Sequence, residues 1–127
     1  MSEIPKIIHQ LWIGDKPAPI NLMNTWKEAH PDFEYIFWNE EEIKKRKFIF
    51  SCQEKIDDIA EINGKADIMR WEILKKMGGI FIDADSICLN PLDKQILSKG
   101  AFSGYENELL RPGLIATGTM GFPPEHI

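Results

Sequence analysis

The segment 66–82 constrains the fold of this chain more than any other. Its apolar residues recur at steps of three and four, which predicts a helix with one buried stripe, formed by Ala66, Met69, Ile73, Leu74 and Met77. Gly78 and Gly79 follow, and glycine accepts the left-handed backbone geometry found at helix C-termini. Residues 80–82 then predict a short strand that is apolar on both faces. A buried helix that passes directly into a buried strand is typical of an α/β fold.

Strands and helices alternate along the rest of the chain. Apolar, β-branched and aromatic runs predict strands over 6–13, 34–38, 101–105 and 114–119. Asn24 is a candidate cap for a helix that ends before His30, because Pro31 follows, and 40–46 predicts a further helical turn or two. Ser51 is a candidate cap for an amphipathic helix that carries Ile56, Ile59, Ala60 and Ile62. This order of elements predicts the α/β class, with at least part of the sheet parallel.

Composition limits the class of protein. The 127 residues are 43% hydrophobic and 28% charged, which suits one globular domain, and no repeat or linker divides them. The net charge of −5 argues against nucleic-acid binding, and no apolar run is long enough for a transmembrane segment. The first residues lack the basic and apolar regions of a signal peptide, so we expect a cytoplasmic location.

Two aspartates, Asp83 and Asp85, directly follow the strand 80–82. If the extended geometry persists, their side chains point the same way, at the sheet edge where open α/β sheets bind ligands. Two close carboxylates repel each other, and Mg²⁺ or Mn²⁺ shared with substrate phosphates resolves this repulsion. The alternative is a solvated loop with two acidic turn residues, because an Asp-x-Asp pair alone is a weak motif. A buried strand that ends in the pair favours the site.

Asp67 and Arg70 form a second polar group, three residues apart and therefore neighbours on one helix surface. Arg70 falls inside the apolar stripe, where a guanidinium must be paired or must face a ligand. The spacing leaves two alternatives equally open. One is an internal Asp67–Arg70 salt bridge, and the other is a polar clamp beside the strand, reaching hydroxyls or phosphates.

Trp12 ends the first strand just before Gly14, so its ring can lie at the same sheet edge and stack on a flat ligand. The alternative, a tryptophan of the core, is favoured when the residue is considered alone. His9, on the same strand, is expected to point into the sheet and form hydrogen bonds there. None of the histidines has the spacing of a metal site.

Three segments together resemble a known family: IPKIIHQLWIG at 4–14, TWKEAHPDFEYIFWNE at 25–40 and ADIMRWEILKKMGGIFIDADSICLNPLD at 66–93. Their order and spacing are similar to those of the glycosyltransferases with the DXD sugar-binding region. That group includes the yeast initiating mannosyltransferases and, more distantly, the glucosylating clostridial toxins. The resemblance covers nearly the whole chain and implies a GT-A type fold, a Rossmann-like, mixed and mostly parallel sheet flanked by helices.

The resemblance also implies roles at a nucleotide pocket. Trp12 matches the aromatic residue that stacks on the uracil of a nucleotide sugar, and Ile13 and Gly14 match the lining of that pocket. A UDP-sugar donor is therefore favoured over GDP-mannose, which stays open.

Other matching positions imply sugar and metal contacts. Asp67 and Arg70 match the pair that contacts the donor sugar, and Arg70 also reaches toward the diphosphate. Asp83 matches the first aspartate of the motif, which touches ribose and sugar, and Asp85 matches the second, which ligates Mn²⁺ against the diphosphate. We therefore expect Asp67, Arg70 and Asp83 to act in catalysis, and Asp85 with Asp83 to hold Mn²⁺ or Mg²⁺.

The function expected from this resemblance is retaining, metal-dependent transfer of a sugar from a nucleotide sugar to a glycan or other acceptor. Because the sequence shows no Golgi-type anchor, bacterial surface-polysaccharide synthesis is one expected setting, and a viral origin fits equally. Family members have a longer catalytic domain, so we expect 1–127 to be a single donor-binding domain, truncated on its acceptor side. Donor binding would then be intact, and transfer impaired or dependent on a partner. Two alternatives remain: a non-catalytic module that binds nucleotide sugars, and a phosphohydrolase with an aspartyl nucleophile. The phosphohydrolase is disfavoured because no later pair of aspartates follows.

Overall fold

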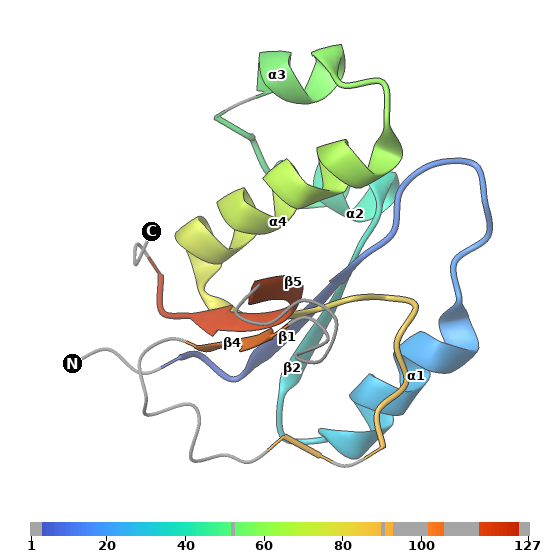
Figure 1. The fold of residues 1–127 in the computed structure, drawn as a ribbon, viewed down its shortest axis with the longest axis vertical. Coiled ribbons are helices and arrows are strands. Elements are labelled where there is room, and N and C mark those ends of the chain that lie inside the picture. Colours follow the sequence, from blue (N-terminus) through green and yellow to red (C-terminus); the bar gives the residue numbers. More distant parts are fainter. Residues whose placement is uncertain (1–3, 52, 90, 93–101, 106–114, 125–127) are drawn as a thin grey trace.

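The computed structural model describes residues 4–51, 53–89, 91–92, 102–105 and 115–124. Helices and strands alternate along the first two thirds of the chain, and two further strands follow (Figure 1). In chain order the elements are β1 (Ile7–Leu11), α1 (Ile20–Ala29), β2 (Glu34–Trp38), α2 (Glu40–Lys45), α3 (Gln53–Asp58), α4 (Ile62–Met77), β3 (Gly79–Ile82), β4 (Phe102–Tyr105) and β5 (Ile115–Phe122). The α/β class expected from the sequence is confirmed.

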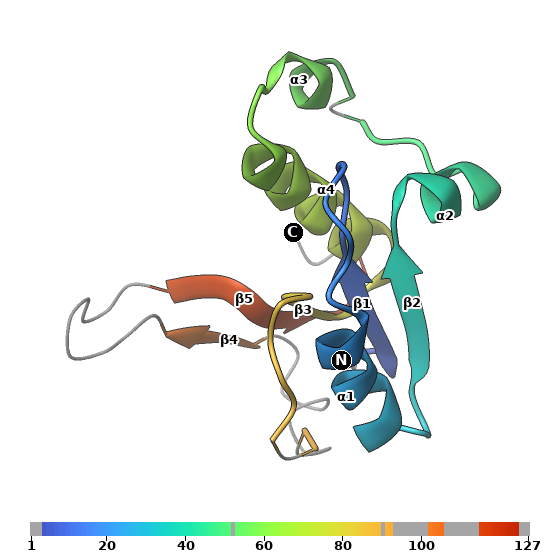
Figure 2. The same cartoon turned by 90° about the vertical axis from the view of Figure 1, so that its right-hand side faces the viewer.

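The described strands form one sheet in the order β2-β1-β3-β5-β4. β1 pairs in parallel with β2 on one side and with β3 on the other. β5 pairs antiparallel with β3 and with β4. Among the described strands β5 therefore runs against the other four, which makes the sheet mixed and mostly parallel, as expected. Figure 2 shows β4 and β5 as an arm that extends beyond β3.

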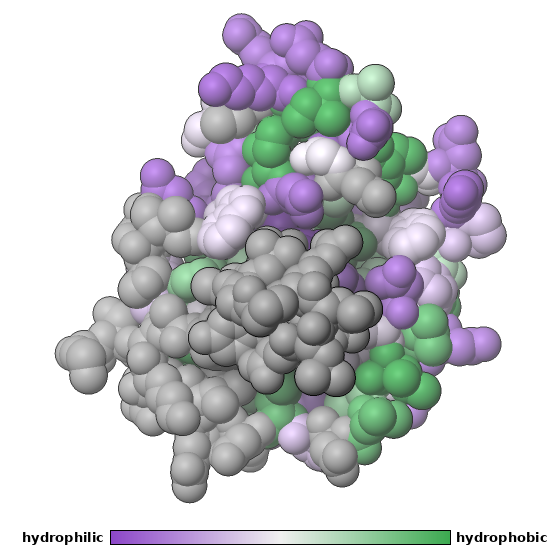
Figure 3. Space-filling model, in the orientation of Figure 1, coloured by the Kyte–Doolittle hydropathy of each residue, from purple (hydrophilic) through white to green (hydrophobic). Residues whose placement is uncertain are grey.

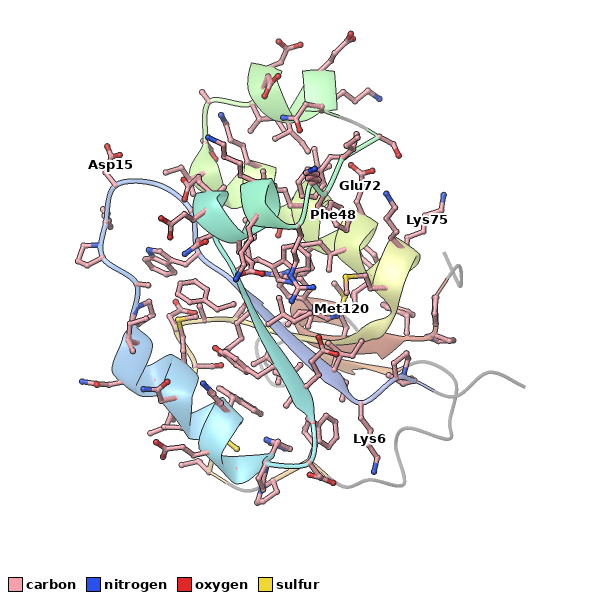
Figure 4. The ribbon with its side chains drawn as sticks, turned by 180° about the vertical axis from the view of Figure 1, so that it is seen from behind. Lys6, Asp15, Phe48, Glu72, Lys75 and Met120 are labelled. Atoms are coloured by element: carbon pink, nitrogen blue, oxygen red, sulfur yellow. The ribbon has the colours of Figure 1, made fainter. Side chains whose placement is uncertain are left out.

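Each face of the sheet has its own apolar core. On one face, Ile73 and Leu74 of α4 pack with Trp38 and Phe81 of the sheet. Met120 of β5 belongs to the same cluster and lies on the α4 side in Figure 4. On the other face, Trp26 of α1 packs with the side chains that alternate to that side, Ile8, Ile80 and Ile82. β3 is thus buried on both faces, as its apolar sequence predicts.

The glycine pair between α4 and β3 is required by a close approach of backbones. Gly78 and Gly79 have φ angles of +68° and +114°. A Cβ on Gly78 would lie 2.7 Å from the backbone nitrogen of Pro124, and one on Gly79 would lie 2.8 Å from the carbonyl oxygen of Ile7. The predicted end of the helix at these glycines is confirmed, since the helix ends at Met77.

Two helix boundaries differ from the sequence prediction. α1 begins at Ile20, with Pro19 as its N-cap, so Asn24 lies inside the helix. Proline is tolerated there because the first turn of a helix needs no N–H from it. The helix expected after Ser51 is divided: α3 ends at Asp58, and Ile62 begins α4, four residues earlier than expected.

α3 is a polar tip of the molecule. Exposed charged and amide side chains flank its single buried residue, Ile56, and hydrophilic side chains gather over it in Figure 3. Of the helices in the described residues, none has the length and apolarity that crossing a membrane would require.

Candidate functional site

The predicted site residues meet where β1 and β3 end. These parallel strands pair His9 with Phe81, which brings Trp12, just past β1, to the same edge as Asp83, just past β3. A cleft of about 340 Å³ opens there. It is lined by Leu11, Trp12, Ile13, Ile62, Ala66, Asp67, Arg70, Asp83, Ala84 and Asp85. Six of the seven predicted site residues are therefore neighbours in one cleft, at the edge that open α/β sheets use for ligands.

Arg70 pairs with Asp83 across the cleft. Its Nη2 donates to Asp83 Oδ1 over 2.9 Å, and the guanidinium stacks over the Phe81 ring, 5.2 Å from the centroid. Arg70 is only 9% exposed, so this pairing offsets much of the cost of burying its charge. The spacing left open a salt bridge with Asp67 or a contact with a ligand, and the structure shows an ion pair with Asp83, which the spacing did not predict. Asp67 lines the cleft beside the pair.

The cleft carries an excess of negative charge. Its lining residues include three carboxylates, from Asp67, Asp83 and Asp85, and one guanidinium, from Arg70. Partial burial raises the pKa of Asp83, Arg70 opposes that shift, and the charges of Asp85 and Asp67 add to it. A cation beside Asp83 would stabilise its ionised form, so the charges that line the cleft favour a positively charged ligand.

The two aspartates of the motif lie on a turn and not on an extended strand. β3 ends at Ile82, and the chain turns at Ala84 and Asp85. Ser86 closes the turn, since its Oγ donates to the carbonyl oxygen of Asp83 over 2.6 Å and its backbone N–H donates over 3.3 Å. The extended geometry on which the shared direction of the two side chains depended does not persist, because the Ser86 side chain, three residues on, bonds to the Asp83 carbonyl. Both aspartates nevertheless line the cleft.

The donor set fits a divalent ion that is shared with a substrate. Among the residues that the structure describes, no group of three or more His, Cys, Asp or Glu is placed to hold a metal. Asp83 and Asp85 supply two carboxylates, and Mg²⁺ is commonly held by one or two carboxylates together with substrate phosphates. This pair of carboxylates therefore fits a metal that is bound jointly with a diphosphate.

Trp12 forms part of the cleft wall and not of the inner core. Its backbone N–H extends the sheet by donating to the Trp38 carbonyl over 2.9 Å, and its indole N–H donates to the Lys16 carbonyl over 2.8 Å. The ring is half-buried and is held by the loop that follows β1. Trp12 lines the cleft at the sheet edge, and its stacking on a base stays a prediction.

Gly14 supports this loop from outside the cleft lining. Its φ is +101°, and its N–H donates to Oε2 of Glu40 at the start of α2 over 2.9 Å. Its expected contact with a nucleotide stays a prediction. Figure 4 shows the next residue, Asp15, at the tip of the loop and directed away from the sheet.

Sequence reasoning missed several residues of the cleft wall. Ala66 lies one turn and Ile62 two turns before Arg70 on the same face of α4, and all three line the cleft. The signal for them was the four-residue spacing, which places side chains one above the other on a helix. Sequence reasoning also missed Glu40, which is not a wall residue but accepts the bond from Gly14. No local pattern indicated this contact, because the two residues lie on different elements.

The fold matches a solved glycosyltransferase. A structure entitled PaToxG Glycosyltransferase aligns with a TM-score of 0.73 over 98% of this chain and 57% of that chain, at 19% identity. The fold is therefore of the GT-A class.

Residues 18–103 match the family described as the glycosyltransferase sugar-binding region containing DXD motif, and the chain belongs to this family. The family expected from the three sequence segments is thus confirmed.

Curated relatives agree with this assignment. Inositol phosphoceramide mannosyltransferase 3 of Schizosaccharomyces pombe is 33% identical over 98% of this chain and 35% of its own length. The mannosyl phosphorylinositol ceramide synthase SUR1 of Saccharomyces cerevisiae is 29% identical, over 97% and 32%. An uncharacterized glycosyltransferase, L373, of Acanthamoeba polyphaga mimivirus is 30% identical, over 97% and 51%. The chain spans about a third of the length of the yeast relatives and half of the viral one.

Proposed function

We propose that this chain provides the donor site of a metal-dependent glycosyltransferase, which moves a sugar from a nucleotide sugar to an acceptor. The observation that carries the proposal is the cleft at the ends of β1 and β3, with Trp12 and Arg70 on its walls beside three aspartates. An aromatic face for a base, a guanidinium and carboxylates for a metal diphosphate, and a carboxylate for sugar hydroxyls are the groups that such a donor needs.

The proposed role of each residue comes from the matching positions of the family, and the shared cleft supports these roles. Trp12 stacks on the base, and Asp67 and Arg70 contact the sugar, with Arg70 also reaching the diphosphate. Asp83 contacts the ribose and the sugar, and Asp85 holds Mn²⁺ or Mg²⁺ together with Asp83. The metal, when bound, supplies a Lewis acid to the departing diphosphate. Arg70 adds a fixed positive charge where that negative charge develops.

The donor and acceptor classes are further parts of the proposal. A UDP-sugar is favoured by Trp12, while the relatives' names, which specify mannosyltransferases, support GDP-mannose as the competing donor. Those names specify inositol phosphoceramide as acceptor, and a glycan is the other class to test. We further propose that transfer retains the anomeric configuration. A role in cytoplasmic polysaccharide synthesis stays a prediction.

A non-catalytic donor-binding module is the second candidate. Among the residues that the structure describes, every lining residue of the cleft lies between Leu11 and Asp85, in the part of the chain that comes before β4 and β5. Donor binding can therefore occur in this chain whether or not transfer follows.

A thermal-shift titration tests donor binding directly. The wild-type chain is titrated with UDP, GDP, UDP-glucose, UDP-galactose, UDP-N-acetylglucosamine and GDP-mannose, each with and without Mn²⁺. A ligand at about 100 times its Kd adds about 2.7 kcal/mol of stability, which is readily measured. Two variants are compared: Asp85→Asn in the cleft, and Asp58→Asn, which changes an exposed aspartate at the end of α3.

The proposal expects stabilisation that needs Mn²⁺, disappears in Asp85→Asn and persists in Asp58→Asn. The ligand with the largest shift identifies the donor. Incubation of that donor with an acceptor then separates the two candidates, because only a transferase releases the nucleoside diphosphate at a rate that depends on the acceptor. Absence of a shift with every nucleotide would refute both candidates.

A further inference from the structure

The backbone carbonyl of Asp83 is held by three donors. Ser86 donates to it through its hydroxyl over 2.6 Å and through its N–H over 3.3 Å, and Gln10 Nε2 donates over 3.2 Å. Gln10 lies on β1 and is fully buried, 73 residues before Asp83 in the sequence. The first peptide unit of the turn is therefore anchored to the middle of the sheet.

A second layer of hydrogen bonds orients these donors. Tyr35 on β2 donates its hydroxyl proton to Gln10 Oε1 over 2.6 Å, which leaves the amide N–H₂ of Gln10 directed at Asp83. Burial raises the pKa of Tyr35 to about 12, so its hydroxyl stays a donor at physiological pH. Trp26 on α1 donates its indole N–H to both Oγ and the carbonyl oxygen of Ser86, each over 3.1 Å. Side chains of β1, β2 and α1 thus converge on one turn.

The carboxylate of Asp85 has no comparable support of its own. Asp83 is held by Arg70, whereas Asp85 forms no hydrogen bond or ion pair with any residue in the part of the chain that the structure describes. The position of the Asp85 carboxylate therefore depends on the backbone of the turn. Charge repulsion among Asp67, Asp83 and Asp85 acts against that backbone when no cation is present.

We propose that Gln10, Tyr35 and Ser86 are positioning residues that hold the Asp83–Asp85 turn in its ligand-ready shape before the metal diphosphate arrives. The inference rests on the proposed donor site and adds to it a buried support on the opposite side of the sheet from α4. Without that support the turn can take several shapes, and part of the binding free energy is then consumed in ordering it.

Two single-atom deletions test this role, Tyr35→Phe and Ser86→Ala. Each removes one hydroxyl and leaves the cleft-lining side chains unchanged. Ser86→Thr is the conservative variant that keeps the hydroxyl. Thr25→Val is the matched control, because the Thr25 hydroxyl also lies on the α1 side and bonds to Leu22 and Cys88, but not to the turn carbonyl.

The affinity for Mn²⁺ in the presence of UDP is measured by calorimetry, and amide hydrogen exchange at Ser86 is measured without metal. We expect Tyr35→Phe and Ser86→Ala to weaken Mn²⁺ binding about tenfold, as loss of partners behind metal ligands commonly does. Ser86→Thr and Thr25→Val should retain wild-type affinity. In the metal-free chain, both deletions should speed exchange at Ser86 and the control should not.

The outcomes separate the two proposals. If the wild type binds Mn²⁺ and both deletions bind it equally well, the positioning role is refuted and the proposed function stands. If Thr25→Val loses as much affinity as the deletions, the effect is general destabilisation and the positioning role is again refuted. If the wild type does not bind Mn²⁺, the proposed donor site fails. Unchanged exchange at Ser86 refutes the support of the turn whatever the metal result.

Discussion

Acidification should lower the free energy of unfolding of this chain through one buried histidine. His9 is fully buried on β1, and its Nδ1 accepts from the indole N–H of Trp38 over 3.0 Å. Because an indole only donates, the proton of His9 resides on Nε2, which lies 2.8 Å from the Gly78 carbonyl oxygen. The expectation that His9 points into the sheet and bonds there is confirmed. Burial lowers the pKa of His9 from 6.5 to about 4.

The sign and size of the effect follow from this shift. As the pH falls below 6.5, His9 takes up a proton in the unfolded chain but stays neutral in the fold until about pH 4. The unfolded state binds more protons throughout this window, so the free energy of unfolding decreases as the pH decreases. A shift of one pKa unit corresponds to about 1.4 kcal/mol, so the free energy of unfolding decreases by about 3 kcal/mol in total between pH 6.5 and pH 4. That is a large fraction of the stability of a small domain.

Urea unfolding near pH 7 and near pH 4, on the wild type and on His9→Gln, measures this contribution. Glutamine retains a donor and an acceptor but does not titrate, and every other group contributes equally to both proteins. The wild type should therefore lose about 3 kcal/mol more than the variant between the two pH values. Equal losses in the two proteins would refute the assignment of a neutral, buried His9.

Two further predictions concern the loop that follows β1 and the aspartates of the cleft. Gly14→Ala should lower the free energy of unfolding by about 1–3 kcal/mol in urea titrations, because alanine is strained at a φ of +101°, and an unchanged midpoint would contradict the need for glycine. Ile62 Cδ1, which would lie 2.5 Å from the new Cβ, can rotate away, so the backbone accounts for the loss. Asp83→Asn should leave the urea midpoint of the ligand-free chain unchanged or raise it. The pKa of Asp83 is raised in the fold, so ionisation of this group near neutral pH opposes folding, and the amide oxygen still accepts from Arg70. The same variant should weaken Mn²⁺ binding in a calorimetric titration with UDP, and a clearly lower urea midpoint would contradict the electrostatic argument.

Local patterns predicted most of the elements that carry the cleft. The strand 34–38 and the strand that precedes Asp83 were predicted from runs of β-branched and aromatic residues. The end of α4 followed from Gly78 and Gly79. These features depend on neighbours within a few residues, which is the range over which periodicity and capping act.

Contacts between distant elements could not be predicted in the same way. From the sequence, the partner of Arg70 was either Asp67 or a ligand, whereas the structure pairs it with Asp83, which lies 13 residues away, just past the end of β3. The bond from Gly14 to Glu40 spans 26 residues, and that from Gln10 to Asp83 spans 73. Such pairs are fixed by how the sheet is assembled, and spacing along the chain carries no information about them.

The position of Arg70 relative to Asp83 follows from the connection between α4 and β3. Only Gly78 separates the two elements, so α4 must reverse direction and lie back along the strand, which brings its side chains over the strand. Glycine permits this reversal because it has no Cβ. A Cβ on Gly79 would lie only 2.8 Å from the carbonyl oxygen of Ile7. A side chain at this position would push α4 and β3 away from β1, and Arg70 would move relative to Trp12. The glycine pair therefore allows α4 and β3 to pack close to β1, although neither glycine is among the lining residues of the cleft.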